Sequence, residues 1–240
     1  MERTLRLRVE QLKGHPRPDR TYVIGADPSG GTGNDLSAIE CVCMETLEQV
    51  LEVANSEIDP VAFGHLLCQL GHEYNEAFLV VEGNHHGIAT HAVIRKNYPL
   101  QRIYKRFLPV KGTVKYGFNT SRNTKAELVG ACKELIDLGL TLYSERLITA
   151  MMSFEEDPQT GQMGGTEDDL VIAICMASVG CFKYSRFKRD LHQTVEPKVG
   201  DTIAERNKRV PSGNLAVYSF EDIFEERFKP YPALPRMLRA

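Results

Sequence analysis

The stretch Tyr22-Val-Ile-Gly-Ala-Asp27-Pro-Ser-Gly-Gly-Thr-Gly-Asn-Asp35 decides the fold that we predict for this chain. An apolar run of strand type ends on the acid Asp27, a glycine-rich loop follows, and a second strand-like run begins at Leu36. A carboxylate at the end of a buried strand costs free energy unless something pairs with it. A metal ion is one such partner. The stretch therefore predicts an acidic site at a strand end, completed by acids from elsewhere in the chain.

Two later segments carry acids in comparable positions. Glu82 ends the apolar run 77–81, and Asp168 and Asp169 open a long apolar segment of helical type. Each acid has a structural alternative when taken alone, because a turn accounts for Asp27 and helix capping accounts for the later pair. Their occurrence in this order, each at a strand end or a helix start, favours one shared site.

Carboxylates that converge in this way suit Mg²⁺ or Mn²⁺, which prefer oxygen ligands. Two such ions cleave a phosphodiester, because one activates the attacking water and the other stabilises the leaving oxygen. Such hydrolysis leaves a 3′-hydroxyl and a 5′-phosphate. The predicted catalytic and metal-binding residues of this two-ion site are Asp27, Glu82, Asp168 and Asp169. Asp35 is predicted as a turn residue or as an additional metal ligand.

Other catalytic patterns are missing from the sequence. No G-x-S-x-G motif occurs, and no cysteine is paired with a well-placed histidine. His85, His86 and His91 lack a fourth ligand at the spacing of zinc sites, which argues against zinc. The loop 28–35 is followed neither by the Gly-Lys-Ser/Thr of a phosphate loop nor by a helix, so it is not a nucleotide-binding loop of the Walker or Rossmann type.

The order of the predicted elements indicates an α/β fold with a mixed central sheet flanked by helices. Strands at 21–27, 36–44 and 48–53 form an antiparallel meander. A helix at 60–75 then leads to a strand at 77–81 that is buried on both faces. The later elements are helices at 88–96, 124–138, 145–153 and 168–182, strands at 101–107 and 141–143, a short strand or hairpin arm at 115–118, and a loop or hairpin at 154–166.

Helical crossovers have a consequence for the position of the acids. They make the later strands parallel to their neighbours, and ligands gather at the carboxyl ends of parallel strands. Asp27 and Glu82 both stand at such ends. We therefore expect their side chains to be neighbours.

Length and composition fit a soluble globular protein of one sizeable domain. The chain has 240 residues, of which 42% are hydrophobic and 25% are charged. The first segment is rich in charged residues, and the last is polar and contains five prolines, which indicates extended chain rather than packed structure. We predict a linker remnant at 1–20, the compact domain at 21–190 and a polar, proline-containing tail at 191–240.

Cysteine usage and the absence of long apolar runs indicate the compartment. The six cysteines contain no C-x-x-C pair, and most lie in apolar runs, which predicts reduced core cysteines. The first residues lack the apolar core of a signal peptide, and no apolar run approaches the ~20 residues that span a bilayer. We therefore expect a protein of a reducing cytoplasm, without contact to membranes.

A basic stretch runs from residue 95 to residue 125, in a chain whose net charge is −3. It carries nine Lys or Arg and no Asp or Glu, with aromatic residues interleaved. Such segregation predicts a surface that binds DNA phosphates through charge, with little dependence on base sequence. The predicted DNA-binding residues are Arg95, Lys96, Arg102, Lys105, Arg106, Lys111, Lys115, Arg122 and Lys125.

Four motifs follow one another in the chain. They are Gly25-Ala-Asp27-Pro-Ser-Gly-Gly, Val81-Glu82-Gly-Asn, Gly117-Phe-Asn-Thr-Ser-Arg-Asn-Thr-Lys125 and Glu167-Asp-Asp-Leu-Val-Ile-Ala. Together, and in this order, they resemble the C-terminal nuclease domain of the large terminase subunit of tailed bacteriophages. The resemblance implies a ribonuclease H-like fold, and it places the metal-binding acids of that family on the four acids named above.

The resemblance also implies a biological setting. Such nucleases cut concatemeric, double-stranded viral DNA in the host cytoplasm, before and after a genome is packaged into a capsid. In that family the nuclease works beside an N-terminal ATPase domain, and it docks to the portal and the small terminase subunit. Because the ATPase phosphate loop is missing here, we expect an excised nuclease domain that is monomeric in isolation. The tail 191–240 is our hypothesis for a docking segment.

Three alternatives stay open at this point. Another ribonuclease H-like nuclease, of the junction resolvase or integrase type, would use similar acids, and a resolvase would require branched DNA. An actin-like or sugar-kinase-like ATPase also has a strand, acid and glycine loop, but it needs a second such loop, which is not evident here. A non-catalytic DNA clamp would tolerate loss of the acids.

Overall fold

The computed structural model describes residues 6–11, 15–108, 112–157, 160, 163–185 and 216–219. Its main sheet has six strands, which are β1 (Arg6–Gln11), β2 (Tyr22–Asp27), β3 (Ser37–Cys43), β4 (Glu48–Asn55), β5 (Phe78–Val81) and β10 (Ala216–Ser219). The helices are α1 (Pro60–Glu73), α2 (Gly87–Asn97), the 3₁₀ helix η1 (Leu100–Arg102), α3 (Arg122–Asp137), α4 (Glu145–Met152) and α5 (Asp168–Ser185). Two short hairpins pair β6 (Lys105–Leu108) with β7 (Thr113–Tyr116) and β8 (Glu155–Glu156) with β9 (Met163–Gly164).

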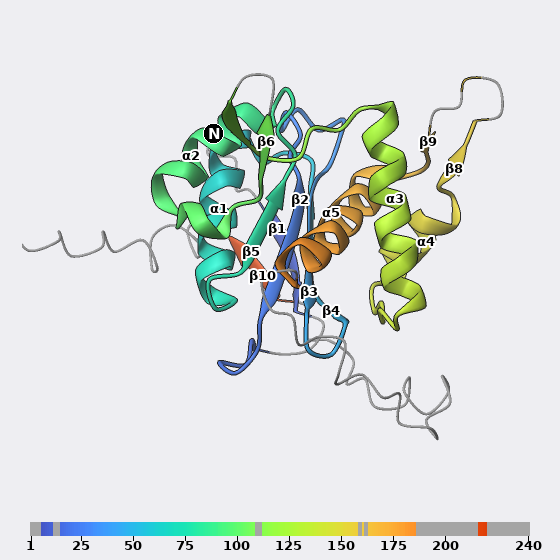
Figure 1. The fold of residues 1–240 in the computed structure, drawn as a ribbon, viewed down its shortest axis with the longest axis horizontal. Helices are drawn as coiled ribbons and strands as arrows, with labels where there is room; N and C mark the ends of the chain where they lie inside the picture. The colour runs from blue at the N-terminus through green and yellow to red at the C-terminus, as the bar shows by residue number, and fades with distance from the viewer. Residues whose placement is uncertain are drawn as a thin grey trace, which may run out of the picture.

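Helices cover both faces of the main sheet (Figure 1). α1 and α2 pack together on one face, and α5 lies across the other face with α3 and α4 beside it. The strand order is β10-β1-β4-β3-β2-β5. β2, β3 and β4 form an antiparallel meander, and β5 is parallel to β2. The predicted α/β fold with a mixed sheet is confirmed.

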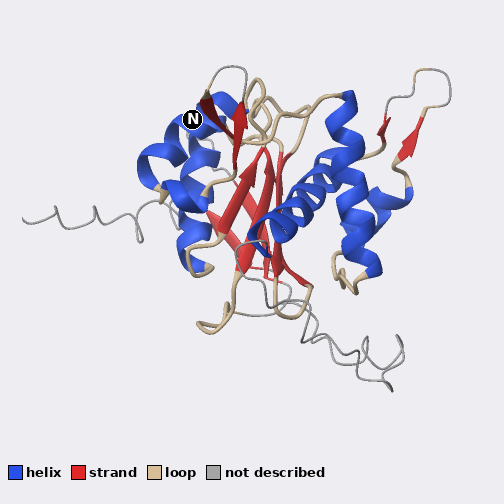
Figure 2. Cartoon of the chain, viewed as in Figure 1, coloured by secondary structure: helices blue, strands red, loops and turns tan. Residues whose placement is uncertain are grey.

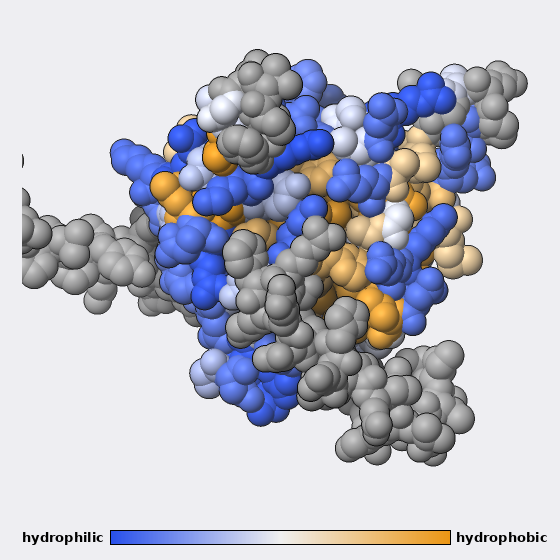
Figure 3. All heavy atoms as spheres, viewed as in Figure 1, coloured by the Kyte–Doolittle hydropathy of each residue, from blue (hydrophilic) through white to orange (hydrophobic). Residues whose placement is uncertain are grey.

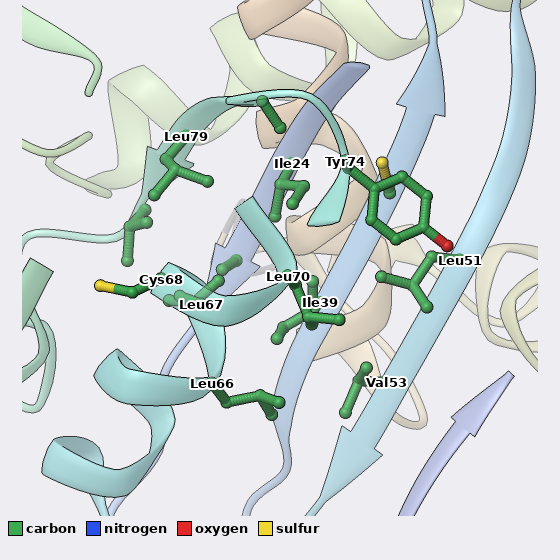
Figure 4. Packing of buried hydrophobic residues seen from close by; sticks show 14 of the residues in the cluster. Ile24, Ile39, Leu51, Val53, Leu66, Leu67, Cys68, Leu70, Tyr74 and Leu79 are labelled. Carbon is green, nitrogen blue, oxygen red and sulfur yellow. The ribbon is translucent and has the colours of Figure 1, made fainter. Parts of the chain in front are cut away.

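The central strands fill two hydrophobic cores, one on each face of the sheet. In β2, Ile24 faces the core that contains α1, and Val23 faces the core that contains α5. Leu79 and Val80 of β5 divide between the two cores in the same way. Figure 4 shows the first core, where Ile24 and Leu79 lie close to Leu67 of α1. Because both faces are buried, these strands have continuous apolar sequences.

Helix α1 begins where the sequence predicts it and sets the direction of β5. The Oδ1 atom of Asp59 accepts the N–H groups of Val61 at 2.9 Å and Ala62 at 3.0 Å. Pro60 occupies the first helical turn, where its missing N–H needs no partner. α1 carries the chain back across the sheet from β4 to the far side of β2, so that β5 runs parallel to β2.

Helix α5 packs directly onto β2 because small residues meet at the contact. A Cβ atom added at Gly25 would lie 2.0 Å from the carbonyl oxygen of Ala173 and 2.4 Å from the amide nitrogen of Ala177. One added at Gly180 would lie 2.4 Å from Cγ1 of Val23. The helix therefore runs antiparallel to β2, and its first turn reaches the carboxyl end of that strand.

The predicted strand at 101–107 is wrong in its extent. Its first part is the 3₁₀ helix η1, and its last part, β6, pairs with β7 in a separate hairpin. Its middle part still lies along β5, where Ile103 forms a parallel bridge with Leu79. The N–H groups of Tyr104 and Phe118 donate to the carbonyl groups of Leu79 and Val81, so two segments complete the edge of β5. β5 has only four residues, and each of the two segments forms a hydrogen bond with one of its carbonyl groups.

Three further segments differ from the prediction. β1 lies in the segment 1–20 predicted as a linker, and it pairs antiparallel with β4 and β10. It thereby covers the edge of β4 that the meander would leave unpaired. β10 lies in the segment 191–240 predicted as a tail. The strand predicted at 141–143 is a single bridge from Thr141 to Glu48. The domain boundaries at 20 and 190 stay predictions.

All six cysteines lie in the described part of the chain, and each is a buried free thiol, as predicted. Among the residues that the structure describes, no helix combines the length and the apolar character needed to cross a membrane.

Gly25→Ala should destabilise the protein by about 3 kcal/mol or more, because an added methyl group at this contact forces backbone shifts. Urea unfolding measures the effect. Gly130→Ala is the matched control, since an added Cβ in the middle of α3 meets nothing within 4 Å. Removing a helical glycine at this position should stabilise the protein by about 0.5–1 kcal/mol. Equal effects of the two substitutions would contradict the packing of α5 on β2.

Candidate active site

The carboxyl ends of β2 and β5 bring Asp27 and Glu82 together. The parallel register pairs Ala26 with Val81, and the N–H group of Glu82 donates to the carbonyl oxygen of Ala26 at 3.0 Å. The next residue after each of these partners is an acid, and the two side chains lie close enough for Glu82 to raise the pKa of Asp27. Figure 2 shows the loops (tan) that gather where the arrows of β2 and β5 end. The expectation that these two acids are neighbours is confirmed.

Helix α5 supplies two further acids from its first turn, Asp168 and Asp169. Oδ2 of Asp169 accepts the backbone N–H of Leu36 at 3.2 Å, which joins the start of the helix to the residue before β3. Both acids lie close enough to Asp27 for their charges to raise its pKa. The structure thus brings together all four acids that the sequence selected.

Burial and mutual repulsion define the electrostatics of this acidic cluster, by which we mean Asp27, Glu82, Asp168 and Asp169. Burial raises the pKa of Asp27 well above its ordinary value, and the neighbouring Glu82 raises it further. Burial also raises the pKa of Asp169 to about 6, and the charges of Asp168 and Asp35 add to the shift, against backbone hydrogen bonds that lower it. Acids whose charged forms repel one another in this way form a candidate site for a cation.

Lys125 lies at the acidic cluster, whereas the sequence analysis predicted it only as a DNA-binding residue. Its ammonium donates to Oδ2 of Asp168 at 3.3 Å and to the carbonyl oxygen of Met163 at 2.8 Å. It also stands 5.5 Å from the ring centroid of Phe154. The Lys125 side chain is 21% exposed, so its charge is partly shielded from water. It compensates one carboxylate and joins α3 to the start of α5.

Asn84 and Gly87, which follow Glu82 in the chain, shape the site, and the sequence analysis gave neither of them a role. Nδ2 of Asn84 donates to Oε1 of Glu82 at 3.3 Å and to the carbonyl oxygen of Thr120 at 2.7 Å. A Cβ atom added at Gly87 would lie 2.0 Å from the carbonyl oxygen of Glu82, so glycine lets α2 start directly behind this acid. Asn84 lies in the turn after β5 and Gly87 is the first residue of α2, but their contacts with Glu82 follow only from the folded shape.

The donor set fits a divalent cation by its chemistry, because it consists of four carboxylates from three elements. Within the described residues, no three His, Cys, Asp or Glu side chains already stand in a coordinating arrangement. Protein groups contact three of the carboxylates, since Leu36 donates to Asp169, Asn84 to Glu82 and Lys125 to Asp168. Asp35 is exposed in the loop before β3, and its role as a ligand stays a prediction.

The basic residues are distributed over α2, η1, the β6–β7 hairpin and α3. Two of them contact aromatic rings, since Arg95 lies 4.9 Å from the ring centroid of Tyr116 and Arg102 donates to the hydroxyl group of Tyr184. Lys125 is partly buried. The remaining described members are exposed, and they are Lys96, Lys105, Arg106, Lys115 and Arg122. Lys111 lies outside the described residues. Figure 3 shows hydrophilic residues (blue) around the hairpin at the top of the view.

Comparison with solved structures returns nuclease domains of phage large terminases. The large terminase nuclease of thermophilic phage G20c with bound magnesium has a TM-score of 0.55 at 21% identity, over 75% of this chain and 89% of that chain. The same nuclease with bound cobalt gives 0.56 at 19% identity, over the same shares. The large terminase nuclease domain of Thermus phage P74-26 gives 0.51 at 20% identity, over 74% and 86%.

The chain has the fold of the large terminase nucleases. The predicted resemblance and the ribonuclease H-like fold class are therefore confirmed. No protein-family model matches the sequence, and no curated protein sequence matches it. The likeness to the terminase nucleases is thus visible in three dimensions, at sequence identities near one residue in five.

Asp169→Asn should stabilise the protein at pH 8 in EDTA and have little effect at pH 3. Because the pKa of Asp169 rises on folding, its protonation stabilises the folded state. This stabilisation is complete below the ordinary pKa of 3.8 and is lost as the pH rises through about 6. The neutral amide avoids this loss, which amounts to about 1–3 kcal/mol at pH 8. Urea unfolding at both pH values measures the difference. Destabilisation of equal size at both pH values would contradict the repulsion that we describe.

Proposed function

We propose that this chain is a metal-dependent endonuclease that cuts double-stranded viral DNA concatemers during genome packaging. The observation that carries the proposal is the meeting of four acids at one edge of a sheet with the terminase-nuclease fold. The G20c nuclease of this fold has been solved with bound magnesium, cobalt or zinc. The raised pKa values of Asp27 and Asp169 also favour a bound cation, which would stabilise their charged forms.

Asp27, Glu82, Asp168 and Asp169 are the residues that would hold two Mg²⁺ or Mn²⁺ ions. Asp27 interacts with each of the three other acids, so it would hold the cations together with all of them. When bound, such ions activate a water molecule and stabilise the leaving oxygen of a phosphodiester. The chain then needs no covalent nucleophile of its own.

The surrounding residues of the chain orient the acids. The N–H group of Leu36 fixes Asp169, and the amide of Asn84 fixes Glu82. Partners of this kind hold acidic side chains in one orientation, and their loss commonly lowers metal affinity or activity. Lys125 balances the charge of Asp168, so that the first turn of α5 carries less net negative charge toward an approaching phosphate.

The exposed cations of the basic stretch would bind the DNA backbone with little sequence preference. By the same likeness of fold, we propose an N-terminal ATPase domain, the small terminase subunit and the portal as partners, and the host cytoplasm as the location. A nuclease of low sequence preference requires control of when it cuts, and such partners would provide that control.

Asp27→Asn should lower plasmid cleavage by at least about a hundredfold, because metal-ion stabilisation is worth several kcal/mol and each 1.36 kcal/mol is a factor of ten. Supercoiled plasmid is incubated with Mg²⁺, with Mn²⁺ or with EDTA, and nicked and linear products are resolved on a gel. The wild-type chain should cut with either metal and not with EDTA.

Asp137→Asn is the matched control for the plasmid assay, since Asp137 is exposed at the far end of α3, twelve residues or about 18 Å along the helix from Lys125. It should cut like the wild type. Cleavage by Asp27→Asn at the wild-type rate would refute the assignment of the acidic cluster. A four-way DNA junction that is cut in preference to plasmid would favour the resolvase alternative.

Mn²⁺ should stabilise the wild-type chain against unfolding, because a ligand that binds only the folded state adds about 2.7 kcal/mol at one hundred times its Kd. Thermal unfolding with Mn²⁺ and with EDTA measures this without any cleavage. Asp27→Asn should lose most of the stabilisation, and Asp137→Asn should keep it. An equal gain in both variants would place the metal away from the acidic cluster.

A further inference from the structure

A pocket of about 260 Å³ lies at the base of the β6–β7 hairpin. Its lining residues are Tyr104, Arg106, Lys115, Gly117, Phe118 and Asn119. No member of the acidic cluster lines it. The pocket therefore needs an explanation of its own, which we take from its charge, its floor and its place in the sheet.

Two cations stand side by side at this pocket. Arg106 and Lys115 are direct partners in the pairing of β6 with β7, so their side chains lie on the same face of the hairpin. Like charges in this position destabilise a strand pair. Across the described residues, neither forms an ion pair with a carboxylate, although Lys115 donates to Oδ1 of Asn119. A pair of cations kept together against their repulsion indicates a site for an anion.

The floor of the pocket is aromatic. The rings of Tyr104 and Phe118 have centroids 5.8 Å apart, and the two residues are only 8% and 3% exposed. Charges beside such an apolar floor are screened less than charges in open water. The amide nitrogen of Asn119 adds a neutral donor, since its oxygen already accepts from Lys115. The combination suits a ligand with an anionic group and an apolar or sugar-like body.

The pocket and the acidic cluster lie next to each other on one face of the sheet. Phe118 is the parallel bridge partner of Glu82, so the two side chains point to the same face. Neighbouring strands are about 4.8 Å apart, which places the pocket floor one strand spacing from this acid. A nucleic acid strand with one phosphate at the acidic cluster would therefore bring its next nucleotide to the hairpin.

We propose that this pocket binds one nucleotide of the DNA strand, directly beside the phosphodiester that is cut. Arg106 and Lys115 contact its phosphate, and its sugar lies against the floor formed by Tyr104 and Phe118. The inference rests on the proposed nuclease function. The volume lies just below the range of about 300–1,000 Å³ that is usual for small-molecule pockets, which suits a single nucleotide better than a larger cofactor.

The double variant Arg106→Ala/Lys115→Ala tests the proposal through DNA binding. Fluorescence anisotropy with a fluorescein-labelled duplex of thirty base pairs, in EDTA and at several salt concentrations, measures affinity without cleavage. The variant should bind at least about tenfold more weakly at 0.1 M salt, and its salt slope should fall by about 1 to 2. Both side chains are exposed, so folding should persist, and thermal unfolding checks this.

Two comparisons separate a built pocket from general attraction by charge. Arg17→Ala/Lys133→Ala removes one Arg and one Lys at exposed positions outside the basic stretch, and it should change affinity less than about threefold. Lys105→Ala removes a cation from the opposite face of the same hairpin, and it should weaken binding clearly less than Lys115→Ala. Equal losses in either comparison would overturn the pocket and leave only net charge as the cause.

The plasmid assay distinguishes the failure of this inference from the failure of the proposed function. If the wild-type chain does not cut but binds duplex DNA through Arg106 and Lys115, the proposed nuclease function is refuted and nucleotide binding at the pocket is supported. A wild-type chain that cuts, with a double variant that binds and cuts equally well, would overturn the pocket alone. Absence of duplex binding by the wild-type chain would also overturn it.

Discussion

The parallel pairing of β2 with β5 is the constraint on which the candidate site depends. Its register sets Ala26 beside Val81, and so it sets Asp27 beside Glu82 at the same edge of the sheet. Two carboxyl groups in this position repel each other when both are charged, and burial adds to the cost. The sheet holds them there because both strands are buried on both faces, where a shift of register would move every side chain to the wrong core.

The contact of α5 with β2 extends this constraint to the other two acids. Gly25 and Gly180 let the helix approach the strand closely, and the helix start then reaches the strand end that carries Asp27. Side chains larger than hydrogen at these positions would lift the helix and move Asp168 and Asp169 away. Close packing of the helix on the strand thus holds acids together that repel one another. Such an arrangement usually marks a site that is kept for function at the expense of stability.

Sequence reasoning succeeded where the local pattern determines the structure. The apolar runs that end on Asp27 and Glu82, and the Asp59-Pro60 start of α1, are such patterns, and together they imply the parallel strand pair. It failed where pairing depends on distant segments. β1 pairs with β4 and β10, which no local pattern in residues 1–20 indicates. The contacts of Asn84 and Gly87 with Glu82 likewise carry no periodicity that a sequence could reveal.

The basic stretch shows how a correct count of charges can mislead about a surface. Nine cations follow one another in the sequence, but Lys125 compensates Asp168, Arg102 binds the hydroxyl group of Tyr184, and Arg95 stacks on Tyr116. The cations left on the hairpin are few, and two of them stand together above an aromatic floor beside Glu82. Under the proposed nuclease function, the position of these cations relative to the acids matters more than total charge. A phosphate that binds away from the acids adds affinity without reaching the site of the reaction.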